Sequence, residues 1–248
     1  MKPLTALFAM SLRQALPLRR TIMLALIQLA PVGIYLFSTT NRTSEAAFDA
    51  LIEIGTATLF ALTVPVVAIV IGASAFGVER RDQTLSFVVL RPISRTALAS
   101  IKTTAAVVGA FGINLIGAVA LGAAHSVRYG DPIIIAGLVV GVFIATAVYV
   151  SVMVPLGFLT DRGVIIGLAY LLVFENGVTT ALPALATLSP WRSGLAALGA
   201  IVDESAPIVS GIVGSPKLTM TQPLTALIVS FVAGVAITAQ MLRQRDLA

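Results

Sequence analysis

The chain alternates long apolar runs with short polar segments. Because about 20 apolar residues cross the ~30 Å hydrocarbon core of a bilayer, six of these runs predict membrane-spanning helices. They cover residues 21–38, 57–77, 103–124, 133–156, 163–177 and 223–241, and the fifth and shortest leaves an extension to Leu182 open. Pro31 and Pro65 lie inside the first two runs and predict a kink in each helix.

Two further stretches predict helices that do not span. In residues 3–20, Arg13 and Gln14 lie opposite an apolar face, which is typical of a helix in the membrane interface, with Arg19 and Arg20 at the headgroup phosphates. That face consists of Leu4, Leu7, Phe8, Leu12, Ala15 and Leu16. The alternative is that the first span begins earlier. The stretch 179–222 mixes Pro, Gly and Ser with apolar residues and predicts short external helices between the fifth and sixth spans, with Trp191 at the interface.

The composition is that of a protein whose surface faces lipid. Hydrophobic residues make up 58% of the 248 residues and charged residues only 11%, whereas soluble domains carry about 25% charged residues. The mean hydropathy is +1.00. We therefore expect an all-α integral membrane protein with a single domain over residues 1–248. The absence of cysteine excludes disulfides and thiol catalysis, and the first apolar run, which lacks a small-residue cleavage pattern, is expected to remain as a span.

The basic residues predict the orientation. With six spans, both termini lie on one side, and 12 of the 16 Lys and Arg residues fall on that side. The other four are Arg42, Arg128, Arg192 and Lys217. Cytoplasmic segments carry the excess of Lys and Arg, so both termini are expected in the cytoplasm of a cell that holds the chain in its plasma or inner membrane. The net charge of +5 does not indicate a nucleic-acid partner, because the basic residues flank apolar runs.

The segment 79–102, ERRDQTLSFVVLRPISRTALASIK, combines charge with an apolar face. Asp82 can cap a short helix that Pro92 ends, and Ser94 can cap a second helix that continues through Lys102 into the third span. The apolar side chains of the short helix are Leu85, Phe87, Val88, Val89 and Leu90. A basic anchor loop explains the arginines but not the apolar residues, whereas a partner protein that docks here explains both.

Candidate chemistry within the chain is sparse. No G-x-x-x-x-G-K-[ST] loop is present, so the chain has no phosphate-binding loop of an ATPase. Ser74 lies in the sequence GASA, but a serine nucleophile needs a histidine within reach. The single histidine, His125, falls at the opposite end of the third span, and we expect it to be a solvated loop residue. The sequence therefore predicts a protein that is not itself an enzyme and holds no metal or cofactor.

Glu175 is the ionisable residue that stands out within the predicted spans. It lies about 18 Å beyond Arg162 at 1.5 Å per residue, and intramembrane acids are functional candidates. Glu175 and Asn176 either mark a break in the fifth span or line the outward pathway, or else the fifth span ends there and Glu175 meets headgroups and water. The spacings Gly137-x-x-x-Gly141 and Gly163-x-x-x-Gly167 permit close helix packing, within one bundle or between two copies.

The chain resembles the ABC-2 type permeases, the membrane subunits of ATP-binding-cassette exporters. The segment GVERRDQTLSFVVLRPISRTALASIK is similar to the family's pattern after its second span, through Glu79, Thr84, Leu85, Pro92, Ser94, Arg95 and Lys102. The segment YLLVFENGVTTALPALATLSPWR is similar to the family's end of span five, through Glu175 and the LSP at residues 188–190. The likeness covers the whole chain.

This resemblance implies two permease subunits, identical or paralogous, that form a pathway in the lipid bilayer. Each permease subunit binds a separate nucleotide-binding ATPase subunit, which holds the ATP and Mg²⁺. The residues that the resemblance and the apolar face together assign to ATPase docking are Glu79, Asp82, Thr84, Leu85, Val88, Val89, Pro92 and Arg95. A secondary transporter or channel is the alternative, although ion coupling usually uses several buried ionisable groups. A scaffold subunit is a third class without a positive feature, and the mostly apolar spans favour a hydrophobic or amphipathic substrate.

Overall fold

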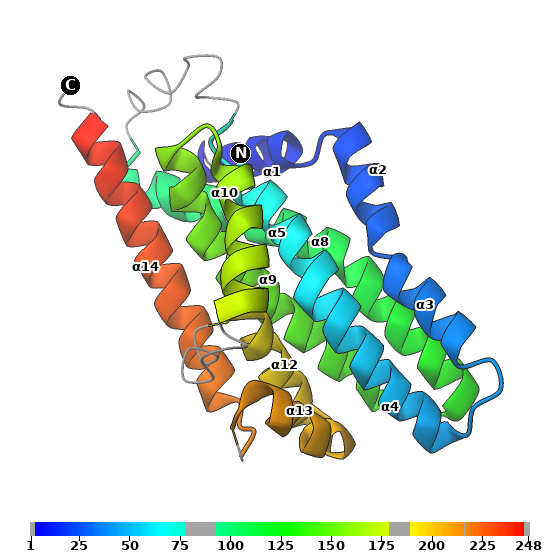
Figure 1. Ribbon diagram of the computed structural model, residues 1–248. Helices are drawn as coiled ribbons and strands as arrows, with labels where there is room; N and C mark the ends of the chain where they lie inside the picture. The colour runs from blue at the N-terminus through cyan, green and yellow to red at the C-terminus, as the bar shows by residue number, and fades with distance from the viewer. Residues whose placement is uncertain (1–2, 78–92, 179–188, 216, 246–248) are drawn as a thin grey trace.

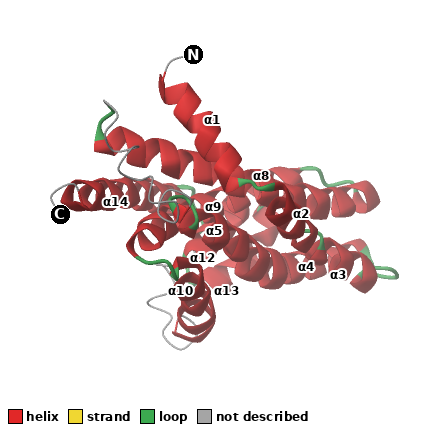
Figure 2. Cartoon of the chain, turned by 90° about the horizontal axis from the view of Figure 1, so that it is seen from above, coloured by secondary structure: helices red, strands yellow, loops and turns green. Residues whose placement is uncertain are grey.

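The computed structural model describes residues 3–77, 93–178, 189–215 and 217–245, and the regular elements within these ranges are helices (Figure 1). Five helical segments are long and apolar enough to cross a membrane: Leu18–Ser38, Ser44–Ala73, Arg95–Tyr129, Ile133–Leu159 and Thr221–Gln244. They lie side by side in one bundle, and Figure 2 shows the same helices from above. The described part of the chain is therefore an all-α membrane protein, as predicted.

The N-terminal helix α1 (Pro3–Ala15) runs across one end of the bundle, where the C-terminal end of α14 (Thr221–Arg245) also lies (Figure 1). It buries Leu7 and Ala15 and packs on α8 (Arg95–Tyr129). The predicted helix over 3–20 ends early because Pro17 adopts an extended conformation and disfavours the helical conformation in the residue before it. The first span begins at Leu18, three residues before the predicted start, and Arg19 and Arg20 belong to its first turn.

Both predicted proline kinks coincide with a change in the helix. The first span consists of α2 (Leu18–Ile27) and α3 (Ala30–Ser38), with Pro31 in the first turn of α3. The second consists of α4 (Ser44–Ile54), the π-helix η1 (Gly55–Thr63) and α5 (Val64–Ala73), with Pro65 in the first turn of α5. Proline lacks the N–H that continues a helical ladder, so the local geometry changes at these positions.

The helix α8 begins where the sequence predicted. The Ser94 hydroxyl accepts a hydrogen bond from the Ala97 N–H at 3.2 Å, which caps the helix that continues into the third span. At its other end Gly130 adopts a left-handed φ of 82°, a conformation that glycine accepts without strain. Only residues 125–129 extend the helix beyond the prediction, because hydropathy detects only the apolar part of a helix.

The fifth predicted span is helical over its predicted residues. The helices α10 (Gly163–Ala169) and η2, a π-helix (Tyr170–Val178), are shorter than the five long segments, and the possible extension to Leu182 lies outside the described residues. The short helices predicted after it are present as α12 (Pro190–Ile201), η4 (Asp203–Ser205) and α13 (Ala206–Val213). Trp191, expected at the interface, is buried in the protein at the start of α12.

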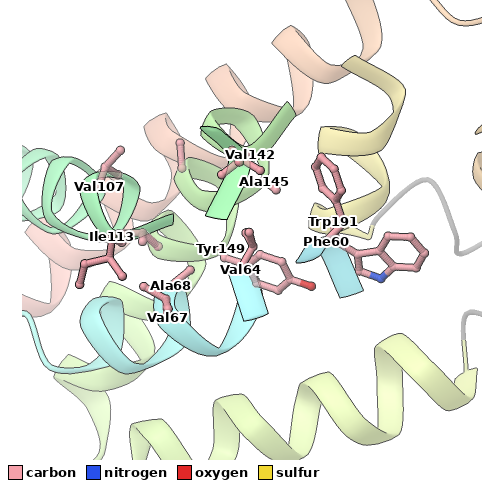
Figure 3. Packing of buried hydrophobic residues seen from close by; sticks show 14 of the residues in the cluster. Phe60, Val64, Val67, Ala68, Val107, Ile113, Val142, Ala145, Tyr149 and Trp191 are labelled. Carbon is pink, nitrogen blue, oxygen red and sulfur yellow. The ribbon is translucent and has the colours of Figure 1, made fainter. Parts of the chain in front are cut away.

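The helix α9 (Ile133–Leu159) occupies the centre and packs on α5, α8, α12 and α14. Buried residues of α9, such as Val142, Ala145 and Tyr149, meet Phe60 and Val64 there (Figure 3). The predicted small-residue spacings serve this packing. A Cβ at Gly141 would lie 2.6 Å from the Gly194 carbonyl oxygen, and Gly137 and Gly167 are similarly close to side chains of the same chain. These glycines therefore mediate packing within one bundle.

Candidate functional site

The predicted docking residues Glu79, Asp82, Thr84, Leu85, Val88, Val89 and Pro92 lie outside the described residues. Arg95 is described and is the first residue of α8, where it is half-buried. Residues 79–92 are called the docking segment below. The structure describes the chain on both sides of this segment, namely the turn that follows α5 and the start of α8.

Lys102 connects these two ends. Its Nζ donates a hydrogen bond to the carbonyl oxygen of Ala75 at 3.0 Å and lies 5.0 Å from the centroid of the Phe76 ring. The side chain is only 2% exposed, and a cation beside the last carbonyls of a helix is favourable. Phe76 in turn packs edge-on against Phe158, with ring centroids 5.2 Å apart. The chain before and after residues 78–92 is therefore held together by a buried cation.

A cavity of about 710 Å³ opens next to the first of these ends. Its lining comes from the α1–α2 junction, the end of α5 and the turn between α9 and α10, and it includes Gln14, Arg20, Ser74 and Asp161. Arg20 Nη2 donates to the Ala15 carbonyl, and Arg20 Nε and Gln14 Oε1 are buried without a partner in the described part of the chain. The cavity therefore contains charged side chains of both signs at the end of the bundle that carries α1.

Glu175 is buried, with 1% of its surface exposed, on the π-helix η2. Tyr170, one π-helical turn earlier, donates its hydroxyl to Glu175 Oε1 at 3.0 Å, and Ser189 donates its hydroxyl to Oε2. The carboxyl group consequently ties η2 to the residue that precedes α12. The structure places the Glu175 side chain inside the protein, and Asn176 is the next residue on the same π-helix.

Aromatic and basic side chains surround this carboxyl group. The Tyr149 hydroxyl from α9 faces Glu175 and the backbone of Trp191, without forming a regular hydrogen bond. Figure 3 shows Tyr149 and Trp191 on the same side of the core. The Arg192 guanidinium lies 5.1 Å from the centroid of the Trp191 ring. Burial lowers the pKa of Arg192, and the charge of Glu175 raises it. The cluster brings together residues from α9, η2 and α12.

A second polar cluster, which was not predicted from the sequence, joins four spans. Gln28 donates through Nε2 to Asn114 Oδ1 at 2.6 Å and accepts at Oε1 from the Thr63 hydroxyl at 3.1 Å. Asn114 donates through Nδ2 to the Thr146 hydroxyl at 2.8 Å. These four side chains are all buried, so each amide finds the partners that a polar group in an apolar interior requires.

This amide cluster lies where the first two spans change their helical geometry. Gln28 follows the last residue of α2, and Thr63 is the last residue of η1. Gln28 also donates to the Thr63 carbonyl oxygen at 3.2 Å. A signal was present in the sequence, because Gln28 and Asn114 are the amide side chains within the first four predicted spans.

The prediction for His125 is wrong. His125 is 2% exposed within α8, and its Nδ1 lies 2.8 Å from the Tyr35 hydroxyl oxygen. The rings of Tyr35, Phe48 and Tyr129 surround the imidazole, with centroid distances between 5.1 and 6.1 Å. The error has a physical reason: α8 continues to Tyr129, so His125 is on a helix and not in a loop, and α3 and α4 cover it.

The fold and these clusters define a multi-pass membrane protein whose buried polar groups hold its helices in register. Within the described ranges no three His, Asp or Glu side chains come together as metal ligands. The family model described as ABC-2 family transporter protein matches residues 17–177. The chain therefore belongs to the ABC-2 transporter family and is an ABC transporter permease. No curated protein and no solved structure gave a match.

Proposed function

We propose that this chain is the permease subunit of an exporter whose ATP hydrolysis takes place on a separate nucleotide-binding subunit. The observation that carries the proposal is the family match over residues 17–177, which includes the docking segment and both of its ends. In this proposal ATP and Mg²⁺ bind to the partner, two permease subunits assemble around one pathway, and the chain itself performs no catalysis.

The membrane arrangement follows from the same proposal. The helices α10 and η2 take the place of the fifth of six spans, so that both termini lie in the cytoplasm and the complex works in the plasma or inner membrane. The Lys102 contact supports a mechanical role for the docking segment, because it joins the end of α5 to α8. A movement of the docking segment, residues 79–92, is then transmitted to α5 and α8, which both pack on α9.

The test is whether an ATPase subunit co-purifies with this chain from the membrane of its host. Val88→Asp places an unpaired charge on the predicted apolar face, and each fully buried side chain of that face contributes about 1.5–3 kcal/mol. Since about 1.4 kcal/mol changes an equilibrium tenfold, we expect at least tenfold less retained ATPase, at normal abundance of the permease. The control replaces Arg80 and Arg81 with alanine and leaves the apolar face intact. If Val88→Asp keeps its ATPase while the control loses it, the segment is only a charged anchor.

Glu175 and Asn176 remain the proposed pathway residues. The burial of Glu175 and its contacts with three helical elements support a role in the moving part of the bundle. Glu175→Gln is expected to insert normally and to change the substrate-stimulated ATPase activity of the assembled complex. The exposed acid Glu204 provides the control through Glu204→Gln. Wild-type transport by the Glu175→Gln complex would restrict Glu175 to a structural role.

A further inference from the structure

The cavity of about 710 Å³ lies where four membrane helices begin or end. Its lining includes Arg20 in the first turn of α2, Ala73 at the end of α5, Thr160 directly after α9 and Gly163 at the start of α10. Because membrane-spanning helices end in the headgroup region, the cavity lies at the depth of the lipid headgroups, on the side of the membrane that carries α1.

An apolar row of side chains leads from the membrane core to this cavity. The helix α5 lies between α10 and the first span (Figure 1), and Val66 and Val70 are the residues of α5 that are not buried. Residues four apart share one helical face, so the exposed Leu62 precedes them on the same row and Ser74 follows them. Ser74 lines the cavity. An acyl chain can therefore follow this row while its headgroup occupies the cavity.

Arg20 and Thr160 offer hydrogen-bond donors to a ligand. The guanidinium carries several N–H donors, of which Nη2 donates to the Ala15 carbonyl, while Nε has no partner in the described part of the chain. The Thr160 oxygen accepts from the Arg162 backbone N–H at 3.2 Å, which leaves its own O–H to donate. A guanidinium and a hydroxyl at headgroup depth suit a phosphate group, which a guanidinium binds through charge-assisted hydrogen bonds.

The other polar groups of the lining select among phospholipid headgroups. Asp161 contributes a carboxylate, which repels a headgroup of net negative charge such as phosphatidylglycerol. Gln14 Oε1 lacks a donor among the described residues, and a carboxylate likewise accepts N–H groups. An ethanolamine headgroup brings N–H donors on its ammonium group, whereas a choline headgroup of the same charge brings none. The lining therefore favours ethanolamine.

We propose that this cavity binds the headgroup of an ethanolamine phospholipid as a resident lipid. The phosphate lies at Arg20 and Thr160, the ammonium group lies at Asp161 and Gln14, and an acyl chain follows the unburied row of α5. The lipid joins the start of α2, the end of α5 and the turn between α9 and α10. Because it binds the folded chain, it stabilises that chain by mass action. Binding is measured on the permease alone, so its outcome does not depend on ATPase docking.

The experiment uses the full chain, delipidated in detergent, and dioleoyl phospholipids that differ only in their ethanolamine, choline or glycerol headgroup. Native mass spectrometry counts the bound lipid, and thermal unfolding reports its effect. We expect the ethanolamine lipid to bind saturably and to raise the unfolding temperature, and the other two to bind about tenfold more weakly, as for the loss of one charge-assisted hydrogen bond. Equal binding of all the lipids overturns the proposal. Equal competition by soluble O-phosphoethanolamine also overturns it, because the acyl chain would then contribute nothing.

Four variants locate the binding site. Arg20→Gln should weaken binding of the ethanolamine lipid by about tenfold, and Ser74→Phe, which fills part of the cavity, should abolish it. Asp161 is exposed, so Asp161→Asn tests the headgroup preference even if Arg20→Gln fails to fold, and it should remove the preference over the glycerol lipid. The control Arg162→Gln removes a positive charge from the same turn outside the lining and should bind as the original chain does. Unchanged binding by Ser74→Phe, or an unchanged preference in Asp161→Asn, overturns the proposal.

Discussion

Gln28 Nε2 donates a hydrogen bond to Asn114 Oδ1 over 2.6 Å, and this contact joins the first span to the third in the interior of the bundle. Thr63 and Thr146 extend the contact to the second and fourth spans. The four helices are therefore joined by hydrogen bonds between side chains that are all buried.

The first prediction concerns this amide cluster. Asn114→Leu removes one of the two acceptors of Gln28 Nε2 and the donor to the Thr146 hydroxyl, and an unsatisfied buried group costs about 1–3 kcal/mol. We expect the double variant Gln28→Leu with Asn114→Leu to lose less stability than the sum of the two single variants, because it leaves fewer orphaned groups. The measurement is a double-mutant cycle of unfolding free energies in detergent. Strict additivity would show that the two amides do not interact.

The second prediction concerns the contact between α5 and α9. A Cβ at Gly157 would lie 2.0 Å from the Ala73 carbonyl oxygen, so the helices must separate in Gly157→Ala. Overpacking of this kind costs about 1–3 kcal/mol. The matched control is Gly112→Ala on α8, where no atom lies within 4 Å and where the higher helix propensity of alanine stabilises by about 1 kcal/mol. Thermal denaturation should shift the two variants in opposite directions.

The third prediction concerns Lys102. Lys102→Met keeps an apolar stem beside Phe76 but removes the hydrogen bond to Ala75, and charged hydrogen bonds contribute about 1.5–3 kcal/mol. We expect a lower unfolding temperature and less retained ATPase, because the two ends of the docking segment are no longer joined. The exposed Lys217 serves as control through Lys217→Met. If both variants keep the ATPase equally well, the contact between Lys102 and Ala75 has no part in docking.

The fourth prediction concerns orientation. Since the chain has no cysteine, single cysteines report their own side of the membrane. Glu204→Cys and Gln244→Cys are suitable because both positions are exposed, whereas Ser205 is buried. In intact cells an impermeant maleimide should label Glu204→Cys, and Gln244→Cys should react only after lysis. Labelling of both from outside contradicts the proposed six-span arrangement.

Much of the site was accessible from sequence because it depends on local rules. The cap at Ser94 follows from a hydroxyl before a helix, and the kinks near Pro31 and Pro65 follow from the missing N–H. Glu175 could be singled out because an acid in an apolar run is costly. Its partners could not be inferred, since Tyr170 reaches it through the π-helical geometry of η2, and Tyr149 and Ser189 are brought to it only by the packing of α9 and α12.

The two misplaced residues, His125 and Trp191, have different causes. Hydropathy finds where a helix is apolar, not where it ends, so His125 was assigned to a loop although α8 continues to Tyr129. Trp191 was assigned to the interface by composition, yet the contact of α12 with α9 buries it. The Gln28 and Asn114 pair was visible as two amides in apolar runs, but the hydrogen bond between them required the relative register of two helices that are distant in sequence.

The sequence by itself determined that the chain crosses a membrane, which stretches are helical, and which acid lies within an apolar run, because apolar length, proline and charge act locally. The tertiary structure alone decided which polar groups satisfy one another. In a lipid environment nearly all surfaces are apolar, so burial of apolar area does not select the pairing of helices. That selection depends on contacts such as Gly141 on Gly194 and Gln28 with Asn114, which exist only once the helices are packed.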